Sequence, residues 1–395
     1  MLHFLNCRCL GLHEAYTLTR AEKTRRTFSI KLSQHGNIDQ IHKSGVNCID
    51  IDPVEGKYLL SSSSHGKIGI HDIECCSFKN KFHCNSIMEA DRNHMGNHRQ
   101  SIETIQWYPH DSGMFVSSSA DKTVRVWDTN ALEVVETFKF EGIVYHHQMS
   151  KVARKHCFIA TGTDDSRVYL CDLKSGSATH ILRGHSSSVL SVAWSPQNEY
   201  LLVSGSRDNK VLLWDIRKAV GSLLSFDQHN GKSSSRTSAI RTAHNGHING
   251  MCFTSNGFHL LTYGTDDRLR LWDVFSGLNT LVNYGQVSNP CRKGIKICVS
   301  GDTQHEVVFV PTESNISVFE ILSGKHVCDL IGHYNTVNCC TFQQDYQGLF
   351  SGANDCNILA WLPDMDRQGE INKDEGETSD KKENVFQDSW SSDED

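Results

Sequence analysis

The sequence predicts an all-β fold, a seven-bladed β-propeller, and two observations carry this prediction. First, the stretch from Tyr200 to Arg217 has the pattern of a β-hairpin, because the β-rich runs Leu201–Ser206 and Val211–Asp215 flank the turn-forming residues Arg207–Lys210. Second, this pattern recurs seven times along the chain, at spacings near the roughly 40–45 residues of a four-stranded blade. Radial stacking buries repeats that cannot bury both faces alone.

The segment before the repeats is predicted to be helical and to comprise residues 1–21. Its apolar residues recur at helical spacing: Leu2, Leu5, Cys9 and Leu12. Gly11 predicts a break before a second helical run, Glu14–Arg20. The apolar face of the first helix either packs on its own domain or fits a groove on another protein.

The propeller is predicted to comprise residues 22–363, and segment 22–35 is predicted to close its ring. Within that segment, apolar residues of Arg26–Leu32 alternate with polar ones, which indicates one strand without a neighbour of its own. The other strands of the last blade lie between Val337 and Trp361. The closing strand is therefore expected to join the two ends of the chain.

Each well-preserved repeat contains a histidine, an aspartate and a tryptophan at matched intervals. Four repeats have all three residues: His98, Asp121 and Trp127; His185, Asp208 and Trp214; His244, Asp266 and Trp272; and His333, Asp355 and Trp361. In the first repeat, His65 stands where the aspartate is expected. Two weaker repeats, which end at Cys171 and Phe319, lack the set, and these two and the first repeat are predicted to be held by packing alone. Long spacings place insertions near Cys75–Asn97 and Gly221–Ala243.

Histidine, serine, aspartate and tryptophan are suited to a hydrogen-bonded tetrad that joins a tight turn to a strand. In the hairpin repeat the serine is Ser204 or Ser206. A serine-hydrolase triad uses some of the same residue types, but a catalytic site is built once in a chain, whereas this set recurs. We therefore expect the tetrads to be structural, with a cost of roughly 1–3 kcal/mol for a partner left unpaired.

Motifs of catalysis and of cofactor binding are not found in the sequence. It has no glycine-rich phosphate loop that opens a helix, no H-E-x-x-H and no nucleophile elbow. A propeller of this kind binds other molecules through its loops. The protein is therefore expected to be a non-enzymatic platform without a cofactor.

Charge is distributed unevenly along the chain. The net charge is −7, but residues 364–395 contain twelve Asp and Glu against four Lys and Arg, a balance of −8, so the body carries about +1. Such a body lacks the basic surface of a protein that grips nucleic acid mainly through phosphates. The acidic tail is expected to be disordered, and it is either a solvated tail or a short interaction motif around Phe386 and Trp390.

The fifteen cysteines are expected to be free thiols in a reducing compartment, because no secretory signal is evident at the start of the chain. Three groups of cysteines lie close together in the sequence: Cys75 with Cys76, Cys339 with Cys340, and Cys7 with Cys9. None has the spacing of paired zinc ligands. They are predicted to be small apolar fillers, with no metal site, and no stretch of eighteen apolar residues predicts a membrane span.

Together with the repeats, six stretches resemble the Cockayne syndrome (CSA-type) family of WD-repeat proteins: Thr104–Asp111, Thr161–Thr163, Leu173–Gly176, Gln228–Lys232, Leu281–Gly285 and Cys356–Trp361. The likeness covers essentially the whole chain. It implies a substrate receptor of a cullin-4 RING ubiquitin ligase that docks on the damaged-DNA-binding triple-propeller adaptor. It further implies a nuclear role in transcription-coupled nucleotide excision repair at stalled RNA polymerase II, with the CSB ATPase and the UVSSA scaffold as partners.

The same resemblance implies which residues bind the adaptor. The run from Trp214 through Asp215 to Arg217 matches the WD-x-R signature of adaptor-binding receptors, and a guanidinium makes bidentate contacts across an interface. The N-terminal helix resembles the helical clamp of such receptors through its apolar residues: Leu2, Phe4, Leu5 and Leu12. The repeats that end at Trp127 and Trp272 lack the arginine.

Two other functions are compatible with a propeller of this kind. One is a scaffold or peptide reader, of the type that binds histone tails, without a role in a ligase. The other is a direct reader of damaged DNA, which conflicts with the near-neutral body.

Overall fold

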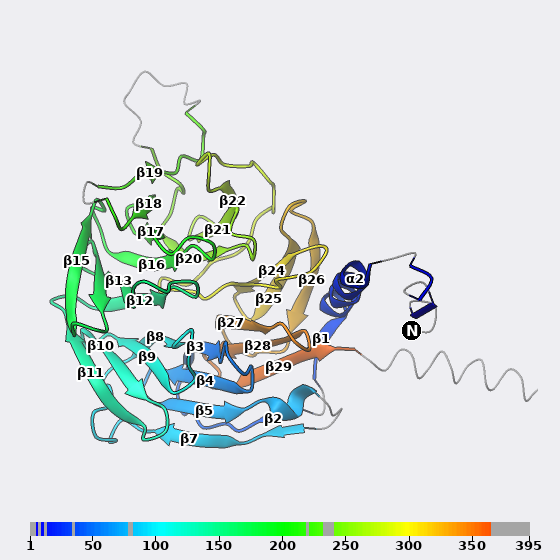
Figure 1. The fold of residues 1–395 in the computed structure, drawn as a ribbon, viewed down its shortest axis with the longest axis horizontal. Coiled ribbons are helices and arrows are strands. Elements are labelled where there is room, and N and C mark those ends of the chain that lie inside the picture. The colour runs from blue at the N-terminus through cyan, green and yellow to red at the C-terminus, as the bar shows by residue number, and fades with distance from the viewer. Residues whose placement is uncertain are drawn as a thin grey trace, which may run out of the picture.

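The computed structural model describes residues 5–6, 9–11, 14–33, 36–77, 82–218, 221–231 and 241–364. Seven antiparallel sheets are arranged around a central axis (Figure 1), which confirms the predicted seven-bladed propeller. One helix of the described part, α2 (Ala15–Phe28), lies over the edge of the ring. No helix within the described residues is long and apolar enough to cross a membrane.

The first three blades each contain four strands. Blade 1 contains β3 (Val46–Ile51), β4 (Tyr58–Ser63), β5 (Ile68–Asp72) and β7 (Ser86–Ala90). Blade 2 contains β8 (Ile102–Trp107), β9 (Met114–Ser119), β10 (Thr123–Asp128) and β11 (Glu133–Lys139). Blade 3 contains β12 (Val144–Met149), β13 (Phe158–Thr163), β14 (Arg167–Asp172) and β15 (Ser177–Arg183).

The remaining blades follow the same order. Blade 4 contains β16 (Val189–Trp194), β17 (Leu201–Ser206), β18 (Val211–Asp215) and β19 (Leu224–Ser225). Blade 5 contains β20 (Ile248–Phe253), β21 (His259–Gly264) and β22 (Arg268–Asp273). Blade 6 contains β23 (Cys298–Val299), β24 (Val307–Thr312), β25 (Asn315–Glu320) and β26 (His326–Ile331). Blade 7 contains β27 (Val337–Gln343), β28 (Gly348–Ala353), β29 (Ile358–Pro363) and β1 (Ile30–Leu32).

The insertion in blade 1 forms structure of its own. A 3-10 helix (Glu74–Ser77) follows β5, and β6 (Phe82–Cys84) pairs in parallel with β2 (Gly36–Ile38). In the other predicted insertion, residues 232–240 lie outside the described part of the chain.

The hydrophobic core is divided among the seven interfaces between neighbouring blades. Each buried cluster of the described residues joins two adjacent blades. For example, Leu170 of blade 3 packs with Val189 and Trp214 of blade 4. Because every blade depends on both neighbours, the ring must close for the first and last blades to be buried.

Two elements from the start of the chain complete the ring. Strand β1 pairs antiparallel with β29, with Ile30 opposite Pro363 and Leu32 opposite Trp361. Ile30 is only 5% exposed and belongs to the cluster between blades 6 and 7. The outer strand of the last blade is thus contributed by the N-terminal part of the chain.

The predicted strand Arg26–Leu32 is wrong in its first half, because residues 26–28 belong to α2. The helix therefore also crosses the predicted boundary between residues 21 and 22. Three alternating apolar residues are a short signal, and helix formers outweigh it here: Glu22 pairs with Arg25 at i,i+3 (2.8 Å) and with Arg26 at i,i+4 (3.1 Å). The tail, residues 365–395, lies outside the described residues, so the predictions for Phe386 and Trp390 stay predictions.

Candidate functional site

The histidine, aspartate and tryptophan of each well-preserved repeat meet around a buried hydroxyl. In blade 4, Ser204 accepts a hydrogen bond from the Trp214 indole (2.8 Å) and contacts His185 Nε2 (2.7 Å), while His185 Nδ1 lies 3.0 Å from Asp208. The carboxylate can only accept, so the neutral imidazole carries its proton on Nδ1, and the serine donates to Nε2. Of the two serines left open by the sequence, Ser204 is the member of the tetrad.

The other three complete tetrads have the same geometry. Blade 2 uses Ser117, blade 5 uses Thr262 and blade 7 uses Ser351 as the hydroxyl, with distances of 2.7–2.8 Å to histidine and tryptophan. In each blade the histidine Nδ1 lies 2.8 Å from the aspartate. These sets link the turn between the second and third strands to the body of the sheet.

Blade 1 has an incomplete tetrad. His42 and His71 both contact Ser61, at 2.8 and 3.3 Å, so His71 takes the place of the tryptophan. His65 is exposed, and the buried Nδ1 atom of His42 has no hydrogen-bond partner among the described residues. The substitution at position 65 therefore leaves one polar atom unsatisfied in the first blade.

Replacement of His65 by Asp is expected to stabilise the protein. The backbone already has the required turn, because Gly66 has a positive φ of 81°, as Lys122 (66°) and Asn209 (65°) do in the complete blades. The new carboxylate would accept from His42 Nδ1 and add about 1 kcal/mol to the free energy of unfolding. Thermal melting of H65D and of the control H65A measures this, and equal melting temperatures would contradict it.

Blades 3 and 6, which lack the set, are not held by packing alone, and that prediction is wrong. In blade 3, Asp165 accepts hydrogen bonds from the hydroxyls of Thr163 and Tyr169. In blade 6, Asp329 accepts from Ser317 at 2.7 Å and contacts His326 Nε2 at 3.0 Å. The intervals of the repeat could not reveal this second set, because Asp329 lies on the fourth strand instead of in the turn.

The buried histidines make the stability of the protein depend on pH. Burial, then the neighbouring His71 and Lys67, lowers the pKa of His42 to about 3. Burial also lowers the pKa of His71 and that of His146 to about 4. Burial opposes ionisation of Asp121 as well, but the hydrogen bonds from His98 and Thr123 and the nearby Arg125 together outweigh it and bring the pKa of Asp121 to about 2.

The free energy of unfolding is therefore expected to fall as the pH drops below about 6.5. Histidine in the unfolded chain has a pKa near 6.5, so the unfolded state binds more protons than the fold between about pH 6.5 and 4, and protonation favours unfolding. Each such histidine lowers stability by about 1.4 kcal/mol per pH unit in this window. Urea unfolding at pH 7, 6 and 5 measures the slope, and equal stability at pH 7 and 5 would contradict the prediction.

The WD-x-R segment ends in a preorganised arginine. Arg217 donates to Asp215 through Nε (3.0 Å) and through a terminal nitrogen (2.7 Å), and its guanidinium lies 4.4 Å from the ring centroid of Tyr200. Trp214 and Asp215 are buried, whereas the Arg217 side chain is 58% exposed. The hydrogen bond from Arg217 lowers the pKa of Asp215, so the carboxylate is charged and holds the guanidinium. Two sides of the arginine are fixed and the rest faces outward.

Arg217 and α2 lie on the same face of the ring. β18 and β29 are the third strands of their blades and run in the same direction, as the order of the sheets requires. Because β1 is antiparallel to β29, the residues before β1 lie where β29 ends, just as Arg217 follows the end of β18. We call this side, where the third strands end, the α2 face.

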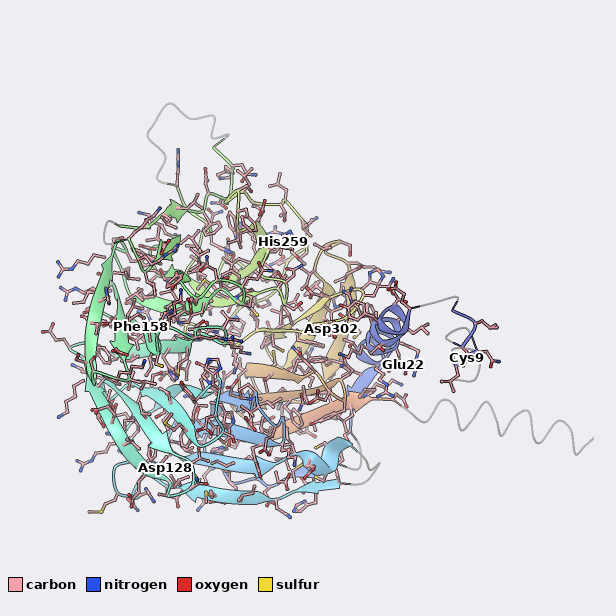
Figure 2. The ribbon with its side chains drawn as sticks, viewed as in Figure 1. Cys9, Glu22, Asp128, Phe158, His259 and Asp302 are labelled. Carbon is pink, nitrogen blue, oxygen red and sulfur yellow. The ribbon has the colours of Figure 1, made fainter. Side chains whose placement is uncertain are left out.

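Contacts with blades 6 and 7 hold α2 on this face. Arg20 donates to the carbonyl oxygen of Thr303 (2.6 Å), and Lys23 pairs with Asp302 (2.8 Å). Asp302 lies on the side of α2 that faces the ring (Figure 2). Thr27 donates to Gln347 at 3.0 Å. The helix is thus part of the described body of the protein.

In the next two blades, the position equivalent to Arg217 is occupied by an apolar residue. Phe275 and Leu322 follow β22 and β25 at the same distance, and they are 80% and 67% exposed. Phe275 contacts Phe258 with ring centroids 6.0 Å apart, and Phe258 precedes it by seventeen residues, as Tyr200 precedes Arg217. Exposed apolar residues therefore occupy this position in the two blades that follow Arg217 around the ring towards α2.

Sequence patterns alone missed Tyr200, Phe275 and Leu322. The signal that could have found them is the equal spacing after the closing residue of each repeat, which identifies equivalent surface positions once the strands are assigned. The predicted clamp residues Leu2, Phe4 and Leu12 lie outside the described residues. Leu5 is described, in helical conformation and 49% exposed.

A cavity of about 970 Å³ runs along the axis of the ring, and Tyr16 and Arg20 of α2 contribute to its lining. Inside it, Lys296 donates to Asp50 (2.6 Å) and to the carbonyl oxygen of Ile49 (2.7 Å). Burial opposes protonation of Lys296, but the neighbouring Asp50 and Cys48 together outweigh it and raise the pKa of Lys296, so the lysine stays charged. The lysine thus links blade 6 to blade 1, which lie on either side of blade 7.

Comparison with known proteins identifies the family. The WD domain, G-beta repeat family matches residues 92–128, 176–215, 236–273 and 324–361. The WD repeat-containing protein ATCSA-1 of Arabidopsis thaliana is 33% identical to the chain, over 89% of this chain and 93% of that protein. The chain belongs to the CSA-type family of WD-repeat proteins.

More distant relatives share parts of the CSA-type propeller. Radiation-sensitive protein 28 of Saccharomyces cerevisiae is 26% identical over 51% of this chain and 44% of its own length. The guanine nucleotide-binding protein subunit beta of Arabidopsis thaliana is 27% identical over 53% of this chain and 54% of its own length. WD-repeat propellers are typically scaffolds or receptors without catalysis, which agrees with tetrads that link turns to strands in several blades.

Proposed function

We propose that this CSA-type protein is the non-catalytic substrate-recognition subunit of a cullin-4 RING ubiquitin ligase. It docks on the damaged-DNA-binding triple-propeller adaptor through the α2 face and acts in the nucleus, in transcription-coupled nucleotide excision repair at stalled RNA polymerase II. The CSB ATPase and the UVSSA scaffold are its proposed partners there. The observation that carries the proposal is the preorganised, outward-facing Arg217 on the same face as α2.

The α2 face has the composition of a docking surface. Arg217 is fixed by Asp215 and Tyr200 before any partner arrives, so little side-chain entropy is lost on binding. Phe275 and Leu322 are exposed at the equivalent positions of the next two blades, and phenylalanine and arginine are enriched at protein interfaces.

Charge reversal at Arg217 tests the proposal. The double variant R217E with L5D is expected to lose the adaptor in a pull-down, and its dissociation constant is expected to rise at least tenfold. A glutamate at position 217 would repel Asp215 and would leave the partner groups of Arg217 on the adaptor without a hydrogen-bond donor. F275D is expected to weaken binding as well. The control is K174E, which reverses an exposed charge at the equivalent position of blade 3. All variants are first compared with the parent protein by thermal melting.

Two results would count against this assignment. If the double variant retained the adaptor fully, the α2 face would not be the surface that binds it. Indifference of the parent protein to the adaptor, together with binding of one linear peptide, would favour the scaffold or histone-tail type of peptide reader instead.

A further inference from the structure

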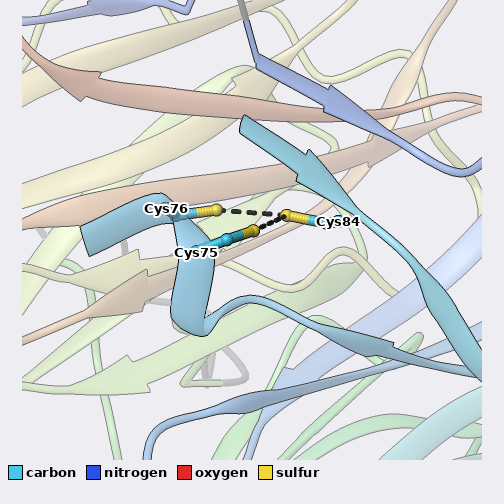
Figure 3. Close-up of side chains that lie close together, drawn as sticks. All are labelled: Cys75, Cys76 and Cys84. Carbon is cyan, nitrogen blue, oxygen red and sulfur yellow. Dashed lines mark hydrogen bonds between the residues drawn. The ribbon is translucent and has the colours of Figure 1, made fainter. Parts of the chain in front are cut away.

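Three cysteine thiols meet in the insertion of blade 1. Cys75 and Cys76 lie on the 3-10 helix Glu74–Ser77, and Cys84 ends β6. Figure 3 shows that Cys75 and Cys76 both point toward Cys84. The Cys84 sulfur lies 3.4 Å from that of Cys75 and 3.2 Å from that of Cys76, and all three sulfurs lie within 4.8 Å of one another.

This arrangement differs from that of apolar fillers, which was predicted because an adjacent pair of cysteines cannot by itself form a zinc knuckle. The fold adds Cys84 from another element. The separations exceed the roughly 2.05 Å of a disulfide bond, and all three are free thiols. Three thiolates on one tetrahedral Zn²⁺ at about 2.3 Å are separated by about 3.8 Å, so the two separations that involve Cys84 need to lengthen by only a few tenths of an ångström to accommodate an ion.

A second observation indicates a missing partner beside the thiols. The hydroxyl of Tyr346 is buried and has no hydrogen-bond partner among the described residues. Tyr346 packs against the apolar cluster that contains Cys76 and Cys84, and Cys75 packs against the same cluster. A buried hydroxyl without a partner is costly, and a water ligand on a metal ion would satisfy it.

We propose that Cys75, Cys76 and Cys84 bind one thiophilic metal ion, Zn²⁺, whose fourth ligand is a water beside Tyr346. Soft thiolates favour Zn²⁺ and Cu⁺ over harder cations, and a site with three protein ligands keeps one position for water. The bound thiols are deprotonated, and their protons pass to the solvent.

The metal site would connect the insertion of blade 1 to the junction between blades 1 and 7. Cys76 and Cys84 pack in the same apolar cluster as Phe350 and Ile358 of blade 7. β6, which ends at Cys84, also pairs with β2, four residues after the closing strand β1. A metal ion here therefore couples the 3-10 helix to the junction between the first and last blades, a structural role independent of docking on the α2 face.

Metal binding by the full chain tests the proposal. Protein stripped with a chelator and kept reduced is titrated with Zn²⁺ in competition with a chromophoric chelator, and Co²⁺ replaces Zn²⁺ for detection of thiolate-to-metal absorption. We expect one ion per chain, a higher melting temperature with Zn²⁺, and at least tenfold weaker binding by C75S and by C84S. The control C157S removes a half-buried thiol outside the cluster and should bind normally.

Cys75 is partly exposed, so C75S keeps the test valid if C84S fails to fold. Three outcomes would overturn the proposal: no stoichiometric metal in the competition assay, equal affinity in C75S and the parent protein, or a Cys76–Cys84 disulfide in protein prepared under reducing conditions. The last outcome would identify the cluster as a redox pair instead.

Discussion

Deletion of residues 1–32 is expected to lower the melting temperature by roughly 10 °C or more, because the ring can no longer close. The deletion removes β1 and leaves β29 as an unpaired edge. It also removes Ile30 from the cluster that contains Val307 and Trp361, which opens the interface between blades 6 and 7. An exposed apolar edge strand favours aggregation as well. Thermal melting with light scattering measures both effects.

The matched control is deletion of residues 1–14. This shorter deletion keeps α2 and β1, with Thr27 on Gln347 and Lys23 on Asp302. It is expected to melt within about 2 °C of the full chain, because it leaves every blade interface intact. If the longer deletion melted like the full chain, β1 would contribute little to stability. The interface between blades 6 and 7 would then be held by the other strands of those two blades.

Trp214→Ala is the second change with a large expected effect, a loss of about 3–5 kcal/mol in the free energy of unfolding. The indole is 1% exposed and packs between blades 3 and 4 with Leu170 and Val189. Its truncation leaves a cavity at that interface and removes the hydrogen bond to Ser204. Urea unfolding, monitored by circular dichroism, measures the loss.

A pair of milder variants separates the hydrogen bond from the packing. Trp214→Phe removes the indole donor of the tetrad. Trp107→Phe makes the same change in volume at a site that is also 1% exposed, but there the buried indole nitrogen has no partner among the described residues. We expect W214F to cost about 1–3 kcal/mol more than W107F. Equal losses would mean that the tetrad contributes no more than packing.

Much of the fold followed from local patterns. The hairpin in blade 4 was predicted with the bounds that β17 and β18 have, because a β-rich run, a turn cluster and a second run are encoded within eighteen residues. The seven blades followed from the recurrence of that unit. The end of α2 did not follow, because helix pairing around Glu22 outweighed the alternation of Phe28, Ile30 and Leu32.

The candidate site shows the same division. Arg217 was found from a linear motif, but its preorganisation depends on Tyr200, which contacts it only when β17 and β18 pair. Phe275 and Leu322 carry no motif, and they become part of one surface because their blades follow blade 4 around the ring. Their equal spacing after β18, β22 and β25 identifies them as equivalent positions only once the strands are assigned.

The sequence by itself determined the repeat, the number of blades, the residue types of the tetrads and the arginine after blade 4, since each is set by spacing within one blade. The tertiary structure alone decided what depends on contacts between distant segments. It selected Ser204 over Ser206, left the Nδ1 atom of His42 without a partner among the described residues, placed α2 on the face of Arg217, and brought Cys84 to Cys75 and Cys76. The placement of α2 needs the ring to close, and the other contacts need the strands of one blade to pair, so the spacing of the repeat does not reveal them.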